Sequence, residues 1–223
     1  MRDDRQFKDH LYDQFARIGK ALASRRRLEL LDVLAQGERS VDDLAAETDM
    51  TVANVSQHLQ VVRHARLAKT RQQGTRVFYS LADERVFTLL QTLREVAHER
   101  LAEIERMTRE VLGGRDPLEL VRFGELVRRM QAGDVVVLDV RPAEEYENGH
   151  IAGSRSLPLD ELEARLAELP PDTEIVAYCR GPYCLLAVEA VDRLRDHNRP
   201  ARRLDLGFPE WQAAGLPVER GRA

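Results

Sequence analysis

The only two cysteines of the chain, Cys179 and Cys184, lie in one short stretch, Cys179-Arg180-Gly181-Pro182-Tyr183-Cys184. An apolar run over 175–178 precedes this stretch and a helical pattern follows it, so we expect a loop that joins a strand to a helix. The loop's N–H groups and the positive end of the helix can stabilise an anion, which lowers the pKa of a cysteine placed there. Because the thiolate is the reactive form, Cys179 at the strand end is the candidate nucleophile.

Cys184 admits two interpretations. It could be a resolving thiol that attacks a modified Cys179 and gives a disulfide or a sulfur-bridged pair. It could equally be a small buried residue in the first turn of the helix. A disulfide needs Cα atoms within roughly 7 Å of each other, which a tight loop can meet, so both interpretations stay open.

The elements around this loop predict a parallel sheet. The run Val135 to Val140 is typical of a strand buried on both faces, and a helical pattern over 123–130 precedes it. The strand at 175–178, the helix at 185–195 and a short strand at 203–204 then alternate, as in α/β domains with helices on both faces of the sheet. A thiol at the carboxyl end of such a strand lies where these sheets bind ligands.

Composition narrows the class of protein. The chain has 223 residues, 43% of them hydrophobic and 32% charged, which predicts a soluble globular protein of one or two domains. No apolar stretch approaches the roughly 20 residues that cross a bilayer, and the Met1 end lacks the apolar segment of a signal peptide, so we expect a cytoplasmic protein with no membrane partner. In a reducing compartment two cysteines are more often reactive than structurally bridged, and two thiols rarely complete a zinc site. We expect neither a cofactor nor a resident metal.

The first half of the chain predicts a DNA-binding module. Apolar spacing indicates helices over 7–18 and 28–34, and Ser40 begins another helix as its N-cap, with Asp43 three residues on. The turn 48–51 separates that helix from one over 52–65, which is the pattern of a helix-turn-helix. Six residues at or in the second helix could contact bases or phosphates in a major groove: Thr51, Asn54, Ser56, Gln57, His58 and Arg63.

A predicted β-hairpin over 68–81, turning at Gln73-Gly74, would form the wing of this module. It carries three more candidate DNA-binding residues, Lys69, Arg71 and Arg76. No acidic residue occurs between Met50 and Ala82, although the net charge of the chain is −4. A basic block in an acidic protein is a candidate nucleic-acid footprint, and the neighbouring helix-turn-helix favours DNA contact over an ordinary solvated hairpin.

A long helical pattern from Val86 to Leu112 presents one broad apolar stripe that needs a partner. Together with the N-terminal helix it suggests a symmetric dimer, which would present two recognition helices to successive half-sites of double-stranded operator DNA. The sequence therefore predicts two domains. Residues 1–112 form a mainly-α winged helix-turn-helix domain that includes a long dimerisation helix. A linker over 113–117 joins it to an α/β domain over 118–223.

The first domain resembles the arsenic-repressor (ArsR) family of winged-helix regulators, through the residues 53–59 (Ala-Asn-Val-Ser-Gln-His-Leu) and the wing end 77–81 (Val-Phe-Tyr-Ser-Leu). The resemblance covers roughly residues 7–110 and implies a homodimeric repressor that leaves its operator when an inducer binds. The family's metal-binding motif aligns with 38–44, where Ser40 and Asp42 replace both thiolates, and His98 lacks the partners of a second metal pattern. We therefore expect no direct metal sensing in this domain.

The second domain resembles a rhodanese, through the motifs 138–142, 145–153, 179–184 and 207–211, and the resemblance covers roughly residues 118–220. It implies that Cys179 carries a persulfide, whose outer sulfur the amides of Arg180 to Cys184 cradle; Arg180, Gly181, Tyr183 and Cys184 complete the candidate catalytic set. Four motif residues are interpreted as structural, forming buried ion pairs and turns: Asp139, Arg141, Glu145 and His150. Phosphatase-like relatives need an arginine where this chain has Leu185, so phosphate and arsenate substrates are disfavoured.

Our hypothesis is a repressor that responds to reactive sulfur species through a persulfide on Cys179, supplied by small donors such as a persulfide or thiosulfate. One alternative is a rhodanese-type sulfurtransferase tethered to DNA by a winged helix that does not depend on sulfur. A weaker alternative is a repressor that senses a metalloid through Cys179 and Cys184, since soft three-coordinate ions require another thiolate.

Overall fold

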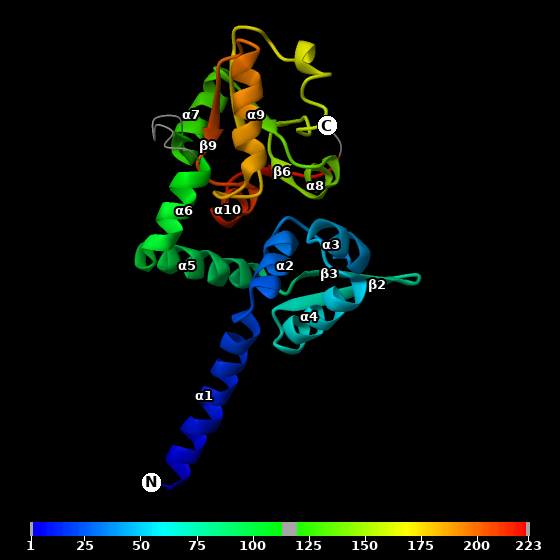
Figure 1. Ribbon diagram of the computed structural model, residues 1–223, viewed down its shortest axis with the longest axis vertical. Coiled ribbons are helices and arrows are strands. Elements are labelled where there is room, and N and C mark those ends of the chain that lie inside the picture. The colour runs from blue at the N-terminus through cyan, green and yellow to red at the C-terminus, as the bar shows by residue number, and fades with distance from the viewer. Residues whose placement is uncertain (1, 113–119, 222–223) are drawn as a thin grey trace. The chain divides into compact units, whose positions relative to one another are not determined.

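The computed structural model describes residues 2–112 and 120–221, and the chain divides into two compact units, Met1–Leu93 and Arg94–Ala223 (Figure 1). The division falls inside helix α5 (Glu84–Arg100). The predicted linker, residues 113–117, lies outside the described residues, so the predicted domain limits stay a prediction.

The first unit packs helices around a small antiparallel sheet. Its elements are α1 (Arg2–Leu22), α2 (Arg25–Ala35), β1 (Arg39–Ser40), α3 (Val41–Glu47), α4 (Val52–His64), β2 (Ala68–Gln73), β3 (Arg76–Leu81) and the first part of α5, with strand order β1-β3-β2. The predicted hairpin is confirmed: Gln73 pairs with Arg76, and Gly74 between them has φ +60°, a region that favours glycine. The fully buried Leu30, Leu44 and Leu59 bring α2, α3 and α4 into one core.

The predicted helix-turn-helix is also confirmed, with α3 and α4 joined by the turn 48–51. One prediction was wrong: the pattern over 86–112 is not a single helix, because α5 ends at Arg100 and α6 (Ala102–Leu112) begins after Leu101. No glycine or proline occurs in this stretch, so nothing local signals the break. Where helix formers run without interruption, packing decides where a helix ends. The first part of α5 buries Val86, Phe87 and Leu90, whereas α6 buries no residue among positions 102–111.

The second unit is an α/β domain built on a five-stranded parallel sheet, as predicted. The strand order is β4 (Leu120–Val121), β9 (Ala201–Leu204), β8 (Glu174–Tyr178), β5 (Val135–Asp139) and β7 (Arg155–Ser156), and all neighbours are parallel. Its helices are the last part of α5, α6, α7 (Phe123–Ala132), α8 (Ala143–Asn148), α9 (Leu185–Asp196) and α10 (Phe208–Ala213), with a 3-10 turn at Leu166–Glu168. A two-stranded antiparallel pair joins β6 (His150–Ile151) to β10 (Val218–Glu219).

The sheet of this unit separates two apolar layers. Successive side chains of a strand point to opposite faces, so the central strand β8 contributes to both layers. Ile175 and Ala177 pack in the layer of α9, whereas Val176 and Tyr178 pack in the layer of α7 and α10. Cys179 continues the first series and lies in the α9 layer at the carboxyl end of β8. None of the described helices is both long and apolar enough to span a membrane.

Candidate functional site

The two cysteines are joined in one disulfide across the loop between β8 and α9. Their Cα atoms are 6.3 Å apart, within the distance that a disulfide requires. Cys179 is buried, with 2% of its surface exposed, while Cys184 is half-buried and is the N-cap residue of α9. The loop therefore brings together the two thiols that the sequence proposed as nucleophile and resolving group.

The segment at the start of α10 packs against this loop and bonds to it. The N–H of Phe208 donates a hydrogen bond of 3.1 Å to the carbonyl of Cys179. A side chain on Gly207 would place its Cβ 2.3 Å from the Gly181 nitrogen and 2.6 Å from the Cys179 carbonyl oxygen. Only glycine allows the two segments to approach this closely. Arg203 of β9 adds a hydrogen bond of 3.1 Å to the carbonyl of Pro182.

Two of the five residues from Arg180 to Cys184 offer no N–H group to a bound anion in this structure. The N–H of Cys184 donates to the carbonyl of Gly181 at 3.2 Å, so it does not point to a bound sulfur. Pro182 has no N–H to offer. The cradle formed by the amides from Arg180 to Cys184 stays a prediction, and in the disulfide-bonded loop its candidate donors are the amides of Arg180, Gly181 and Tyr183. The Tyr183 side chain is exposed at the surface of the loop.

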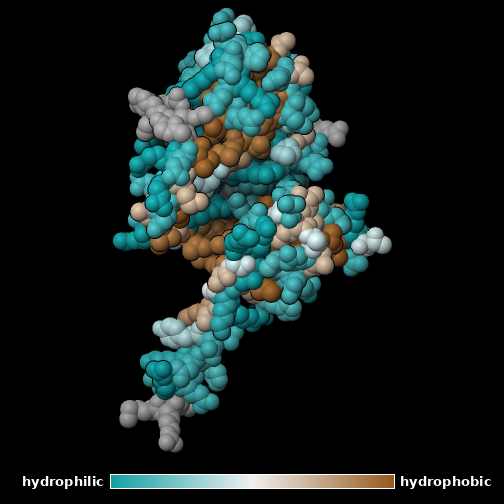
Figure 2. All heavy atoms as spheres, in the orientation of Figure 1, coloured by the Kyte–Doolittle hydropathy of each residue, from teal (hydrophilic) through white to brown (hydrophobic). Residues whose placement is uncertain are grey.

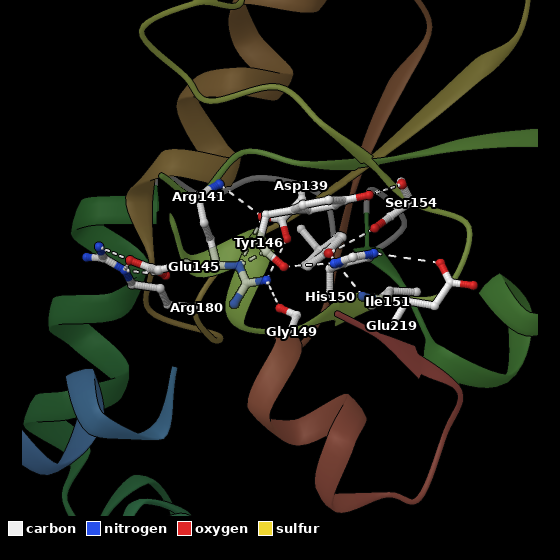
Figure 3. A network of polar contacts seen from close by, with 11 residues as sticks. Asp139, Arg141, Glu145, Tyr146, Gly149, His150, Ile151, Ser154, Arg180 and Glu219 are labelled. Atoms are coloured by element: carbon white, nitrogen blue, oxygen red, sulfur yellow. Dashed lines mark hydrogen bonds and ion pairs between the residues drawn. The ribbon is translucent and has the colours of Figure 1, made fainter. Parts of the chain in front are cut away.

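The side chain of Arg180 turns to Glu145 on α8, 35 residues earlier in the chain (Figure 3). Its Nε donates to both carboxylate oxygens, at 2.9 and 3.2 Å, and its Nη2 donates to Oε1 as well. Glu145 is buried, with 1% of its side chain exposed, whereas Arg180 keeps 30%. The cation that follows the nucleophile is thus bound in a bidentate ion pair, a geometry that arginine forms well with carboxylates.

A fully buried ion pair joins Asp139, the last residue of β5, to Arg141, beside strand β8. Nε of Arg141 lies 2.9 Å from one Asp139 oxygen, and its Nη2 donates to the carbonyl of Gly149 at 2.8 Å (Figure 3). The ring of Phe208 stacks 4.5 Å from the guanidinium. Burial opposes the charge of Arg141, but the Asp139 carboxylate raises its pKa above the ordinary value. The prediction that Asp139, Arg141 and Glu145 form buried ion pairs is confirmed.

The fourth motif residue, His150, is buried against Tyr146. Their rings stack with centroids 3.6 Å apart, and Nδ1 of His150 lies 2.8 Å from the Tyr146 carbonyl oxygen. Ile151 donates its N–H to the hydroxyl of Tyr178, which ties this turn to the sheet (Figure 3). Burial raises the pKa of Tyr178 well above its ordinary value, so the hydroxyl stays protonated.

In the first unit, helix α4 presents the predicted DNA-binding residues on its open side. Val55, Leu59 and Val62 are buried in the core, which leaves the other faces of the helix outward. Of the candidates at α4, four are exposed and two half-buried: Thr51, Asn54, Gln57 and Arg63, then Ser56 and His58. Thr51 caps the helix by accepting the N–H of Asn54 at 3.3 Å. Base and phosphate contacts by these residues stay a prediction.

The wing carries its three basic residues on exposed positions, but they differ in their partners. Arg71 binds Glu38 through Nε, at 3.0 and 3.1 Å from its oxygens, and stacks on Phe78. Lys69 and Arg76 have no ion-pair partner among the described residues. On a DNA backbone Arg71 would have to leave Glu38, so we expect Lys69 and Arg76 to contribute more.

The ArsR resemblance would place two metal-binding thiolates at positions 40 and 42. In this structure Ser40 is instead the N-cap residue of α3 and forms a capping box with Asp43. Ser40 accepts the N–H of Asp43 at 3.2 Å, and Asp43 accepts the N–H of Ser40 at 3.1 Å, so the predicted capping box is confirmed. Ser40 keeps only 2% of its surface exposed. Over residues 2–112 and 120–221 no group of three or more His, Cys, Asp or Glu side chains could hold a metal ion.

Helices α1 and α5 are among those that expose large apolar side chains. On α1 these are Phe7, Tyr12 and Phe15, and on α5 they are Leu89, Leu93 and Val96. Figure 2 shows hydrophobic atoms open on the visible face over α5. Exposed apolar side chains that recur along a helix make it a candidate interaction surface.

Three features of the site were not foreseen from the sequence: the pairing of Arg180 with Glu145, the contact of Gly207 with the cysteine loop, and the bond from Arg203 to that loop. Glu145 and Gly207 both stand in motifs of the rhodanese resemblance. The signal that was missing is the tertiary neighbour, because each pair lies more than 20 residues apart in the chain.

Fold and site together define a two-domain protein, with a winged helix-turn-helix before a rhodanese-type domain. A family model for the "Bacterial regulatory protein, arsR family" matches residues 24–70, and one for the "Rhodanese-like domain" matches residues 123–214. The HTH-type transcriptional regulator Rv0324 of Mycobacterium tuberculosis is 48% identical over 214 residues, which cover 96% of this chain and 94% of that protein. The chain belongs to the ArsR family of transcriptional regulators, in a form that carries a rhodanese-like domain.

Two solved structures match a portion of the chain. The homodimeric winged helix-turn-helix DNA-binding domain Mb0332 from Mycobacterium bovis, 46% identical, covers 42% of this chain and 87% of its own, with a TM-score of 0.41. A rhodanese-related protein from Thermoplasma volcanium, 25% identical, covers 45% of this chain and 96% of its own, also with a TM-score of 0.41.

Proposed function

We propose that this regulator is a homodimeric repressor that responds to reactive sulfur species through Cys179, with Cys184 as the resolving thiol. The observation that carries the proposal is the position of the thiols. Both cysteines of the chain lie within bonding distance in the rhodanese-type loop, and the DNA-binding unit has none. Any thiol chemistry must therefore begin in the second unit and act on DNA binding from there.

The chemistry balances without an additional oxidant. The Cys179 thiolate attacks the outer sulfur of a persulfide donor, the donor's S–S bond breaks, and the donor leaves as a thiolate. Cys184, as a thiolate, then attacks the inner sulfur of the Cys179 persulfide and expels hydrosulfide, which leaves the disulfide. The transferred sulfur is reduced to sulfide while the two protein thiols are oxidised. A dithiol reductant would reset the loop.

The dimer in this proposal rests on the open apolar faces of α1 and α5. A second copy of the chain would bury these faces and place two α4 helices on successive half-sites of an operator. Small changes at such an interface can alter the separation of the two helices, which is how a signal from the second unit could change DNA affinity.

The test measures DNA affinity of the full-length protein before and after exposure to a low-molecular-weight persulfide. The operator is replaced by a duplex that the reduced protein itself selects from a random-sequence pool. Salt is fixed, because phosphate contacts make DNA affinity strongly salt-dependent. We expect a change in affinity that a dithiol reverses and that Cys179→Ser abolishes, while Cys179→Ser binds DNA as tightly as the reduced parent. A Cys179→Ser protein that still responds would contradict the proposal.

Two other outcomes point to other functions. Unchanged DNA affinity together with steady turnover of thiosulfate and cyanide would indicate a sulfurtransferase tethered to DNA. Tight binding of arsenite, lost when either cysteine is replaced, would indicate a metalloid-responsive repressor instead.

A further inference from the structure

The cysteine loop contains one basic residue, Arg180, directly after the nucleophile. An anionic sulfur donor such as thiosulfate, with two negative charges, would be attracted to this site by an available cation there. The structure instead commits the Arg180 guanidinium to Glu145, in a bidentate pair whose carboxylate is almost fully buried. A buried carboxylate at this distance cancels most of the field of the guanidinium.

The other charged groups at the loop do not restore a positive field. Arg203 donates to the carbonyl of Pro182 and interacts electrostatically with Asp205. The buried carboxylate of Glu210 faces Gly181, whose Cβ, if it had one, would lie 3.6 Å from Oε1. Glu210 is itself paired with Arg94 at 3.6 Å, so each of the three carboxylates near the loop has an arginine beside it: Glu145 with Arg180, Asp205 with Arg203 and Glu210 with Arg94.

The surface next to the loop carries more acidic than basic side chains. A hollow of 530 Å³ reaches the first turn of α9 at Leu186, two residues after Cys184. Its lining includes three acidic residues, Glu144, Asp160 and Glu161, and a single basic one, Arg193, whose guanidinium lies 2.6 Å from the carboxylate of Glu189. A donor that approaches over this surface meets more negative than positive charge.

We infer that Glu145 is a specificity-determining residue: by neutralising Arg180 it makes Cys179 accept sulfur from neutral or cationic persulfides and discriminate against thiosulfate and other anionic donors. The inference rests on the proposed function, because it assumes that Cys179 takes up sulfur. Glu145 acts through Arg180 and does not touch the reacting sulfur atoms, so it is a positioning residue rather than a catalytic one.

The experiment measures how fast Cys179 of the full-length protein acquires one sulfur atom, by intact-mass spectrometry, in a Cys184→Ser background that retains the persulfide. Two persulfides of similar size and opposite charge serve as donors, those of cysteamine and of 3-mercaptopropionate. Thiosulfate is the third donor; in its reaction the Cys179 thiolate takes the outer sulfur and sulfite leaves. The quantity compared is the ratio of the rate with an anionic donor to the rate with cysteamine persulfide.

The parent and three variants of the ion pair separate the effect of its charge from its structural role. Glu145→Gln leaves a net positive charge and should raise the anionic-to-cationic ratio on the order of tenfold. Arg180→Gln leaves a net negative charge and should lower the ratio. The double variant restores a neutral pair and should return the ratio close to that of the parent. Asp172→Asn, an equal change of charge before the amino end of β8, is the matched control and should leave the ratio unchanged.

The outcomes are distinguishable. If the ion pair only supported the fold, each substitution would slow all three donors alike and leave the ratio unmoved, which would overturn the inference. The same holds if the parent loads thiosulfate faster than cysteamine persulfide. If Glu145→Gln does not fold, Arg180→Gln and the double variant still decide between the two roles. Failure of every donor to load the parent would instead contradict the proposed function itself.

Discussion

Ser40 and Cys184 both occupy the N-cap position of a helix, but only Ser40 caps its helix with a side-chain hydrogen bond. Ser40 is the N-cap residue of helix α3, and its side chain and backbone exchange hydrogen bonds with Asp43 in a closed capping box. Cys184 is the N-cap residue of helix α9; its backbone is extended, as is typical of an N-cap, but its side chain makes no capping bond. One start uses its helix N–H groups internally, and the other leaves them for a ligand or for water.

The difference lies in what holds each segment in place. The start of α3 is fixed by residues three positions apart, so its geometry is local. The loop before α9 is fixed by distant segments: Gly207 packs against it, and Glu145 and Arg203 bind Arg180 and Pro182. A helix start that must stay open for chemistry cannot be closed by its own cap, so tertiary contacts have to position it instead.

The largest effect should come from breaking the tertiary support of the open loop with Gly207→Ala. The backbone of Gly207, at φ −112° and ψ −170°, suits any residue, so the cost is purely the clash of the new Cβ with backbone atoms 2.3 to 2.6 Å away. We expect a loss of about 3 kcal/mol in the free energy of unfolding of the second unit. The only tryptophan of the chain, Trp211, is buried in that unit, so its fluorescence follows the unfolding by denaturant.

Gly124→Ala is the matched control for that substitution. Its Cβ would meet only the end of the Arg128 side chain, at 3.8 Å, and position 124 lies within helix α7. There alanine should be neutral or should stabilise by up to about 1 kcal/mol. An equal loss in both variants would show that the close approach of Gly207 to the loop has no special role.

The same contrast explains how much the sequence could predict. The capping box was predicted from Ser40 and Asp43 because both partners lie in one turn, and the hairpin was predicted from Gly74 for the same reason. The parallel sheet was predicted from apolar runs. The pair of Arg180 with Glu145 was not, because a sequence shows both charges but not which of many acids folds beside a given arginine. The break at Leu101 depends on packing and has no local signal either.

A smaller effect is expected from opening the closed start of α3 with Ser40→Ala. The variant loses the bond from the Asp43 N–H, and loss of a serine N-cap typically costs about 1 kcal/mol. Denaturation followed by far-UV circular dichroism should show the first unit unfolding earlier, while the Trp211 fluorescence transition stays in place. Ser24→Ala is the control, since Ser24 is the N-cap residue of α2 and makes no side-chain capping bond. It should change the first transition by only a few tenths of a kcal/mol, and a similar loss in both variants would contradict the assigned role of the box.

The smallest effect should come from closing the open start of α9 with Cys184→Ser. In reduced protein the new hydroxyl can accept an N–H of the first helical turn, and serine is a preferred N-cap, so the second unit should gain about 0.5 kcal/mol or slightly more. Trp211 fluorescence under a thiol reductant measures the gain, and Cys184→Ala, which offers no acceptor, should show none. After exposure to a persulfide donor, Cys184→Ser should keep its sulfur on Cys179, because no thiol remains to release hydrosulfide. A serine variant no more stable than the alanine one would mean that the N–H groups at this helix start are already satisfied, and the comparison with Ser40 would fail.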